Sequence, residues 1–116
     1  MEIALQDSLS RGDLFEKFRH QVVRDFEMSG YSAYAPELLS NDYLQVYDAI
    51  FNAVLKVDKL EHNGLMNLLY RVDISEQQIK QATQSSPGKT VYQVVAELII
   101  KRVLQKVIIK QQFSKE

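Results

Sequence analysis

The sequence predicts an all-α protein, a small bundle of four to five helices with a long C-terminal helix. Apolar residues recur at the helical spacing of three and four in each long segment of the chain. Residues that commonly cap helices precede most of these segments. The length of 116 residues, with 46% apolar and 25% charged residues, fits one helical domain spanning residues 1–116.

The first helix is expected to begin after Ser10, which would act as its N-cap, with Asp13 completing a capping-box pattern. Gly30 is expected to end it, because glycine tolerates the left-handed backbone that follows many helices. Residues 1–9 precede this helix, and disorder there is compatible with the sequence. The apolar stripe of the helix consists of Phe15, Phe18, Val22 and Phe26.

A second helix is predicted over residues 43–59, capped by Ser40 or Asn41. Its apolar residues cover more than half of the helix surface. Such a helix must be covered from more than one side, so we expect it to be the central helix of the bundle.

The segment after the second helix allows two interpretations. Either Asn63-Gly64 ends that helix, or Asp58 caps a third helix in which Gly64 allows close approach of a neighbour. The second interpretation is favoured, because it places a continuous apolar stripe on one helical face. Ser75 and Gln78 are then expected to form the capping box of a short fourth helix.

The last helix is predicted from Thr90 to about Phe113, a length of roughly 36 Å. Two apolar rows run along it about 170° apart, so the helix needs a partner on each side. It should also overhang a domain whose expected radius of gyration is about 13 Å. Since symmetric dimers are the commonest oligomers, a second copy of the chain is the simplest partner. The sequence therefore predicts a homodimer interface formed by Ile100, Val103, Leu104, Val107 and Ile108.

Charge and cysteine content indicate the partners and the compartment. The net charge is −1, but residues 1–58 hold ten acids and five bases, whereas residues 89–116 hold two acids and six bases. This split favours contact between the two ends, within a chain or between chains, as readily as it favours contact with an outside partner. The absence of cysteine, of a secretory pattern at the N-terminus and of an uninterrupted apolar span favours a cytoplasmic protein that does not enter a membrane.

Residues 83–90, TQSSPGKT, end like a phosphate-binding loop of the G-x-x-x-x-G-K-[ST] type. Thr83 stands where that loop needs its first glycine, and the segment before it is polar and helical instead of a buried strand. The stretch is therefore interpreted as a connecting turn, with Thr90 as the cap of the last helix. No cofactor is predicted.

Two carboxylate–histidine pairs, Glu16 with His20 and Asp58 with His62, have the spacing that places both side chains on one helical face. The first pair lies away from the apolar stripe and should face water, and Asp58 is already explained as a cap. Because the chain has two histidines in all, no metal site is predicted. No arrangement of side chains suggests a reaction either, so no catalytic residue and no enzyme activity are predicted.

Arg102, Lys106 and Lys110 form a basic row on the last helix. Arg71, near the end of the third helix, is a further candidate contact for an anion or a partner. These residues could bind phosphates without reading a base sequence. The net charge of −1 and the pI near 6.1 argue against nucleic acid.

The sequence thus favours a non-catalytic, cytoplasmic helical protein that self-associates and presents a surface to another protein. The alternative is a nucleic-acid-associated regulator that uses the basic row of the last helix. A helical row of aromatic residues is expected in the core or in an interface, with the lining of a small-molecule pocket as the alternative. This row consists of Tyr43, Tyr47 and Phe51.

Overall fold

The computed structural model describes the backbone of residues 2–114 and the side chains of residues 5–113. This part of the chain forms six α-helices, one 3-10 turn and no strand, which confirms the all-α prediction and the long C-terminal helix. The elements are α1 (Glu2–Leu9), α2 (Gly12–Met28), η1 (Ser32–Tyr34), α3 (Tyr43–Leu60), α4 (Gly64–Val72), α5 (Glu76–Ser85) and α6 (Val91–Ser114).

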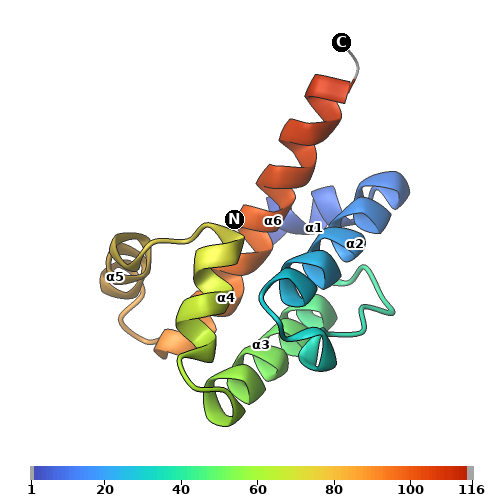
Figure 1. Ribbon diagram of the computed structural model, residues 1–116. Coiled ribbons are helices and arrows are strands. Elements are labelled where there is room, and N and C mark those ends of the chain that lie inside the picture. The colour runs from blue at the N-terminus through green and yellow to red at the C-terminus, as the bar shows by residue number, and fades with distance from the viewer. Residues whose placement is uncertain (1, 115–116) are drawn as a thin grey trace.

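Helix α6 runs through the molecule and contacts α2, α3, α4 and α5 (Figure 1). Its last turns extend past the neighbouring helices (Figure 1). The principal-axis extents are 39 × 31 × 27 Å and the radius of gyration is 13.6 Å. Helix α3 is covered by α1, α4, α6 and η1, as its wide apolar surface predicts. It therefore shares the centre with α6, the helix around which the others are arranged.

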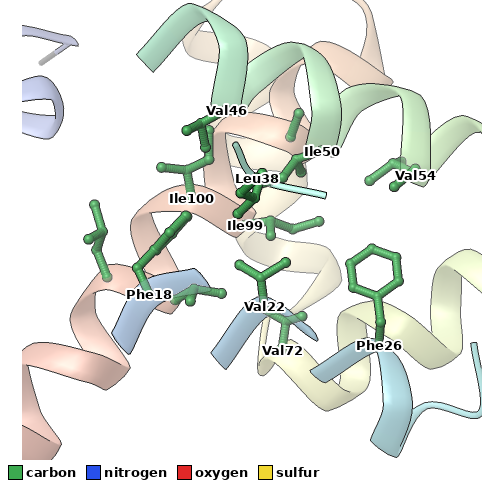
Figure 2. Packing of buried hydrophobic residues seen from close by; sticks show 14 of the residues in the cluster. Phe18, Val22, Phe26, Leu38, Val46, Ile50, Val54, Val72, Ile99 and Ile100 are labelled. Carbon is green, nitrogen blue, oxygen red and sulfur yellow. The ribbon is translucent and has the colours of Figure 1, made fainter. Parts of the chain in front are cut away.

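The core lies between α2, α3, α4 and α6 (Figure 2). Ile99 and Ile100 of α6 are adjacent in the sequence, yet both are fully buried. Successive residues of a helix point about 100° apart, so α6 must be covered over a wide arc. Phe18 and Val22 of α2 and Val46 of α3 are among the side chains that provide this cover (Figure 2).

The N-terminal segment departs from the sequence prediction. Residues 2–9 form helix α1 instead of a disordered segment, and Leu9 is fully buried in the core. Ser10 does not cap α2; its hydroxyl donates to the Gln6 carbonyl oxygen at 2.8 Å, and Arg11 is the N-cap, without a side-chain hydrogen bond. The Gln6 side chain accepts from the backbone N–H of Tyr43 at 2.7 Å. Helix α1 is thus held against the beginning of α3.

Helix α3 occupies nearly the expected range of residues 43–59, but its N-cap and the segment after it differ from the prediction. Its N-cap is Asp42, whose carboxylate accepts from the Gln45 N–H at 3.3 Å, so neither Ser40 nor Asn41 caps it. Asp58 lies inside α3, and the favoured interpretation of Asp58 as the cap of a new helix is wrong. The break comes later, at Asn63, which adopts a left-handed backbone with φ of 55°. Asparagine adopts this conformation more readily than most residues.

The other helix boundaries agree with the sequence prediction. Gly30, with φ of 86°, follows the end of α2. Ser75 and Gln78 form a complete capping box at the start of α5. Thr90 and Gln93 exchange the equivalent pair of hydrogen bonds, of 3.2 and 2.8 Å, at the start of α6.

Tyrosine hydroxyl groups connect elements that lie far apart in the sequence. Tyr34 of η1 donates to Glu61 at 2.7 Å, and Tyr92 of α6 donates to Asp58 of α3. The hydrogen bond to Glu61 is the main cause that raises the pKa of Tyr34, and the hydrogen bond to Asp58 raises the pKa of Tyr92 in the same way. Both carboxylates accept from the neutral phenol and would repel a phenolate. Tyr34 precedes α3 in the sequence and Tyr92 follows it, so these hydrogen bonds connect α3 to segments on both sides.

We predict that Gly64→Ala destabilises the protein by about 1–3 kcal/mol, which is the usual cost of overpacking a well-filled contact. A Cβ atom at Gly64 would lie 2.6 Å from the carbonyl oxygen of Val57 and 2.7 Å from the Cβ of Glu61. Urea-induced unfolding measures the loss. Gly12→Ala is the matched control, since Gly12 also opens a helix but has no atom within 4 Å of the added carbon. A similar loss at both positions would contradict the proposed steric origin.

We also predict that the free energy of unfolding falls at alkaline pH through Tyr34 and Tyr92. A pKa raised in the folded state means that the unfolded chain loses its proton first as the pH rises. The stabilisation is therefore fully present below the ordinary tyrosine pKa of about 10 and is lost as the pH rises above it. Tyr92→Phe should reduce this dependence in unfolding experiments at several pH values, whereas Tyr70→Phe, at an exposed position, should leave it unchanged.

Candidate functional site

Two members of the basic row on α6 turn toward α2. The ammonium of Lys106 lies 2.7 Å from one carboxylate oxygen of Asp25. Gln21 donates to the other oxygen of Asp25 at 2.9 Å and accepts from the Lys110 ammonium at 2.7 Å. Lys106, Asp25, Gln21 and Lys110 therefore form a continuous chain of hydrogen bonds between the two helices, which we call the α2–α6 seam.

The helical repeat explains why the α2–α6 seam forms. Gln21 and Asp25 are four residues apart on α2, and Lys106 and Lys110 are four residues apart on α6, so each pair lies on one face of its helix. Asp25 pairs with the earlier lysine and Gln21 with the later one, which requires antiparallel helices. The carboxylate-bearing side chain of Asp25 is 5% exposed and that of Lys106 is 17% exposed. The ion pair is thus largely removed from water.

Arg102, the remaining member of the basic row, turns toward α4. Its guanidinium lies 2.8 Å from the carboxylate of Asp73, the C-cap residue of α4, whose side chain is 77% exposed. Arg71 and Tyr70 lie beside Asp73 in an open pocket of about 420 Å³ at the end of α4. The structure therefore places Lys106 and Lys110 on the α2–α6 seam and Arg102 in an ion pair with Asp73, whereas Arg71 lines the pocket at the end of α4.

The residues predicted to form a homodimer interface lie in the chain's own core. The side chains of four of them are at most 4% exposed, and Ile108 is partly buried. These four are Ile100, Val103, Leu104 and Val107. Helices α2 and α3 of the same chain supply the second partner that the two-sided helix requires. The four residues cannot serve as a contact surface in this fold, so this assignment must be corrected; self-association itself stays a prediction.

The aromatic row lies on α3, facing the start of α6. The rings of Tyr43 and Tyr47 are 6.2 Å apart and those of Tyr47 and Phe51 are 6.0 Å apart, and Tyr43 is buried in the core. Burial is the main cause that raises the pKa of Tyr47. Tyr43 and Tyr47 also border a small pocket of about 120 Å³. This placement agrees with the core interpretation of the row.

The stretch TQSSPGKT ends α5 and connects it to α6. A helix precedes it where a phosphate-binding loop would follow a strand. Lys89 pairs with Glu97 at 2.8 Å, and Thr90 caps α6. The interpretation as a connecting turn is therefore consistent with the structure.

Two further features, a metal site and a membrane-spanning helix, are absent from the described residues. No three histidine, aspartate or glutamate side chains within residues 5–113 lie together as a metal site would require. Across residues 2–114, no helix combines the length and the apolar character needed to cross a bilayer. No protein-family model matches the chain, and no curated protein or solved structure matches it. Function must be argued from the chemistry of the chain itself.

The sequence leaves open whether the basic row pairs with the acidic front half of the chain or with an outside partner. The charge difference between the two ends of the chain favours pairing of the basic tail with the acidic front half, and the pair Lys106–Asp25 is such a contact. Gln21 carries no charge, and nothing in its spacing separates it from other polar residues of α2. Its role depends on the angle at which α2 crosses α6, which a single sequence does not specify.

We predict that Asp25→Asn destabilises the protein by about 3 kcal/mol, because removing one partner of a largely buried ion pair leaves the other uncompensated. Asp73→Asn makes the same chemical change in an exposed pair and should cost less than about 1 kcal/mol. Asparagine also tolerates the left-handed backbone of Asp73, with φ of 74°. Urea-induced unfolding of both variants measures the difference in the free energy of unfolding. Equal losses would show that the buried ion pair of the α2–α6 seam stabilises the protein no more than the exposed pair does.

Proposed function

We propose that this chain is a non-catalytic, cytoplasmic helical protein that works through self-association and through contact with another protein. The observation that carries the proposal is a pair of exposed apolar side chains near the end of α6. Ile109 is 45% exposed and Phe113 is 70% exposed, four residues apart and therefore on one helical face. Both belong to the last six residues of α6, which ends at Ser114.

The energetics favour a weak, symmetric contact. Burying an apolar side chain of this size contributes about 1.5–3 kcal/mol. Because Ile109 and Phe113 are only 45% and 70% exposed, a two-fold contact between copies of α6 would contribute about 3–7 kcal/mol. This range lies at the lower end of the estimated association cost of about 4–15 kcal/mol. Self-association through this face should therefore depend on protein concentration and be reversible.

Nucleic-acid association through the basic row is the second candidate. It has less support, because Arg102, Lys106 and Lys110 each donate a hydrogen bond to a side chain of the same chain. A phosphate that bound Arg102 or Lys106 would have to displace the carboxylate of Asp73 or Asp25. Binding through the row should also decline steeply as salt is added.

Sedimentation velocity over a range of micromolar concentrations tests the self-association. The wild-type protein should show an average mass that rises with concentration, and Ile109→Asp or Phe113→Asp should return it to a monomer, because each places a charge in the apolar contact. Leu39→Asp is the matched control, since Leu39 is also exposed but lies in the loop before α3. A stable wild-type monomer, or association that survives both substitutions, would contradict the proposal.

A further inference from the structure

A groove of about 310 Å³ lies between α2 and the C-terminal half of α6, beside the α2–α6 seam. This volume is at the lower end of the range usual for small-molecule sites. Helix α2 contributes Lys17, His20, Gln21 and Arg24, and α6 contributes Val107, Lys110 and Gln111. Val107 is the one apolar side chain among these, and the other six lining residues each carry a hydrogen-bonding group above an apolar stem.

The described lining of the groove carries positive charge and no acid. Lys17, Arg24 and Lys110 are cationic at neutral pH, and His20 adds a further positive charge when it is protonated. The carboxylate of Asp25 in the α2–α6 seam already accepts hydrogen bonds on both of its oxygens, and the carboxylate of Asp13 accepts from Gln111 at the edge of the lining. The whole chain has a net charge of −1, so this groove concentrates positive charge against the overall balance.

The seam orders part of this lining. Gln21 is largely buried, and its side-chain amide is oriented because its nitrogen donates to Asp25. Its oxygen then accepts from Lys110 and holds that ammonium at the wall of the groove. The cost of ordering one cationic side chain is therefore already met in the folded protein, which favours binding. At the far end, Gln111 donates to Asp13 at 3.4 Å.

The arrangement of the basic side chains on α2 is also suited to binding an anion. Lys17, His20 and Arg24 follow one another at intervals of three and four residues, so they lie on the same face of the helix. Lys110 faces them from α6. Cations approaching from two helices can surround an anion, and the guanidinium of Arg24 can donate two parallel hydrogen bonds to a phosphate.

From this arrangement we propose that the groove between α2 and α6 binds a phosphate-bearing anion with several negative charges. The recognised chemistry is the phosphate group, whether on a small polyphosphate or on the backbone of a nucleic acid. The site does not depend on self-association, since all of its described lining comes from one chain and includes neither Ile109 nor Phe113.

Titration calorimetry at low salt tests the proposal, with inorganic tripolyphosphate and a single-stranded oligonucleotide as separate probes. Lys17→Gln and Arg24→Gln should each weaken binding about tenfold, which corresponds to about 1.4 kcal/mol. Both side chains are exposed, so these variants should keep their fold, which circular dichroism verifies. Lys80→Gln on α5 and Lys59→Gln on α3 remove the same charge at exposed positions outside the groove and should leave binding nearly unchanged.

The two probes distinguish the sources of the phosphate. Tighter oligonucleotide binding with a steep salt dependence would assign the groove to nucleic acid, and tighter tripolyphosphate binding would assign it to a small anion. The proposal is overturned if neither probe binds at low salt. It is also overturned if the two control substitutions weaken binding as much as Lys17→Gln and Arg24→Gln, since the effect would then reflect net charge alone.

Discussion

The fold depends on one constraint, which is that α6 is apolar around most of its circumference and must be covered on nearly every side. Buried residues follow one another along it from Val94 to Val107, including neighbours such as Ile99 and Ile100. No single helix can cover such an arc, because one neighbour shields only one stripe of a helix surface. Helices α2, α3, α4 and α5 all pack on α6 for this reason, and the remaining elements fill the space between them.

The α2–α6 seam adds a directional contact to this apolar packing. Apolar side chains tolerate small shifts along a helix axis, whereas the pairs Lys106–Asp25 and Lys110–Gln21 form at one alignment of the two antiparallel helices. The net stabilisation from a buried ion pair is often small, because the charges lose their hydration. Its contribution here is better described as selecting one alignment of α2 on α6. The same alignment places the basic residues of α2 beside Lys110 and creates the groove.

The proposed anion-binding groove and the proposed self-association face both lie at the C-terminal end of α6, which is the part least covered by other helices. The groove uses the side of α6 that faces α2, and the self-association face uses Ile109 and Phe113 on the exposed side. This clustering follows from length, because a helix of 24 residues is longer than any of the other helices that pack against it. Its early turns are occupied by the core. The late turns are left with polar and apolar groups that the chain itself covers only in part.

The sequence by itself determined the helical class, the long last helix, and the boundaries set by local hydrogen bonds, such as the capping boxes at Ser75 and Thr90. Those features depend on residues three or four positions apart, so periodicity and cap chemistry can predict them, although the same rules assign the cap of α3 to Ser40 or Asn41 instead of Asp42. Tertiary structure alone decided that α2 and α3 cover the second apolar row of α6, and that Gln21, Lys17 and Arg24 meet Lys110. These outcomes depend on how helices distant in the chain cross one another. An apolar row has the same sequence pattern whether another helix of the same chain or a second copy of the chain covers it. The pattern alone therefore could not identify which of the two covers α6.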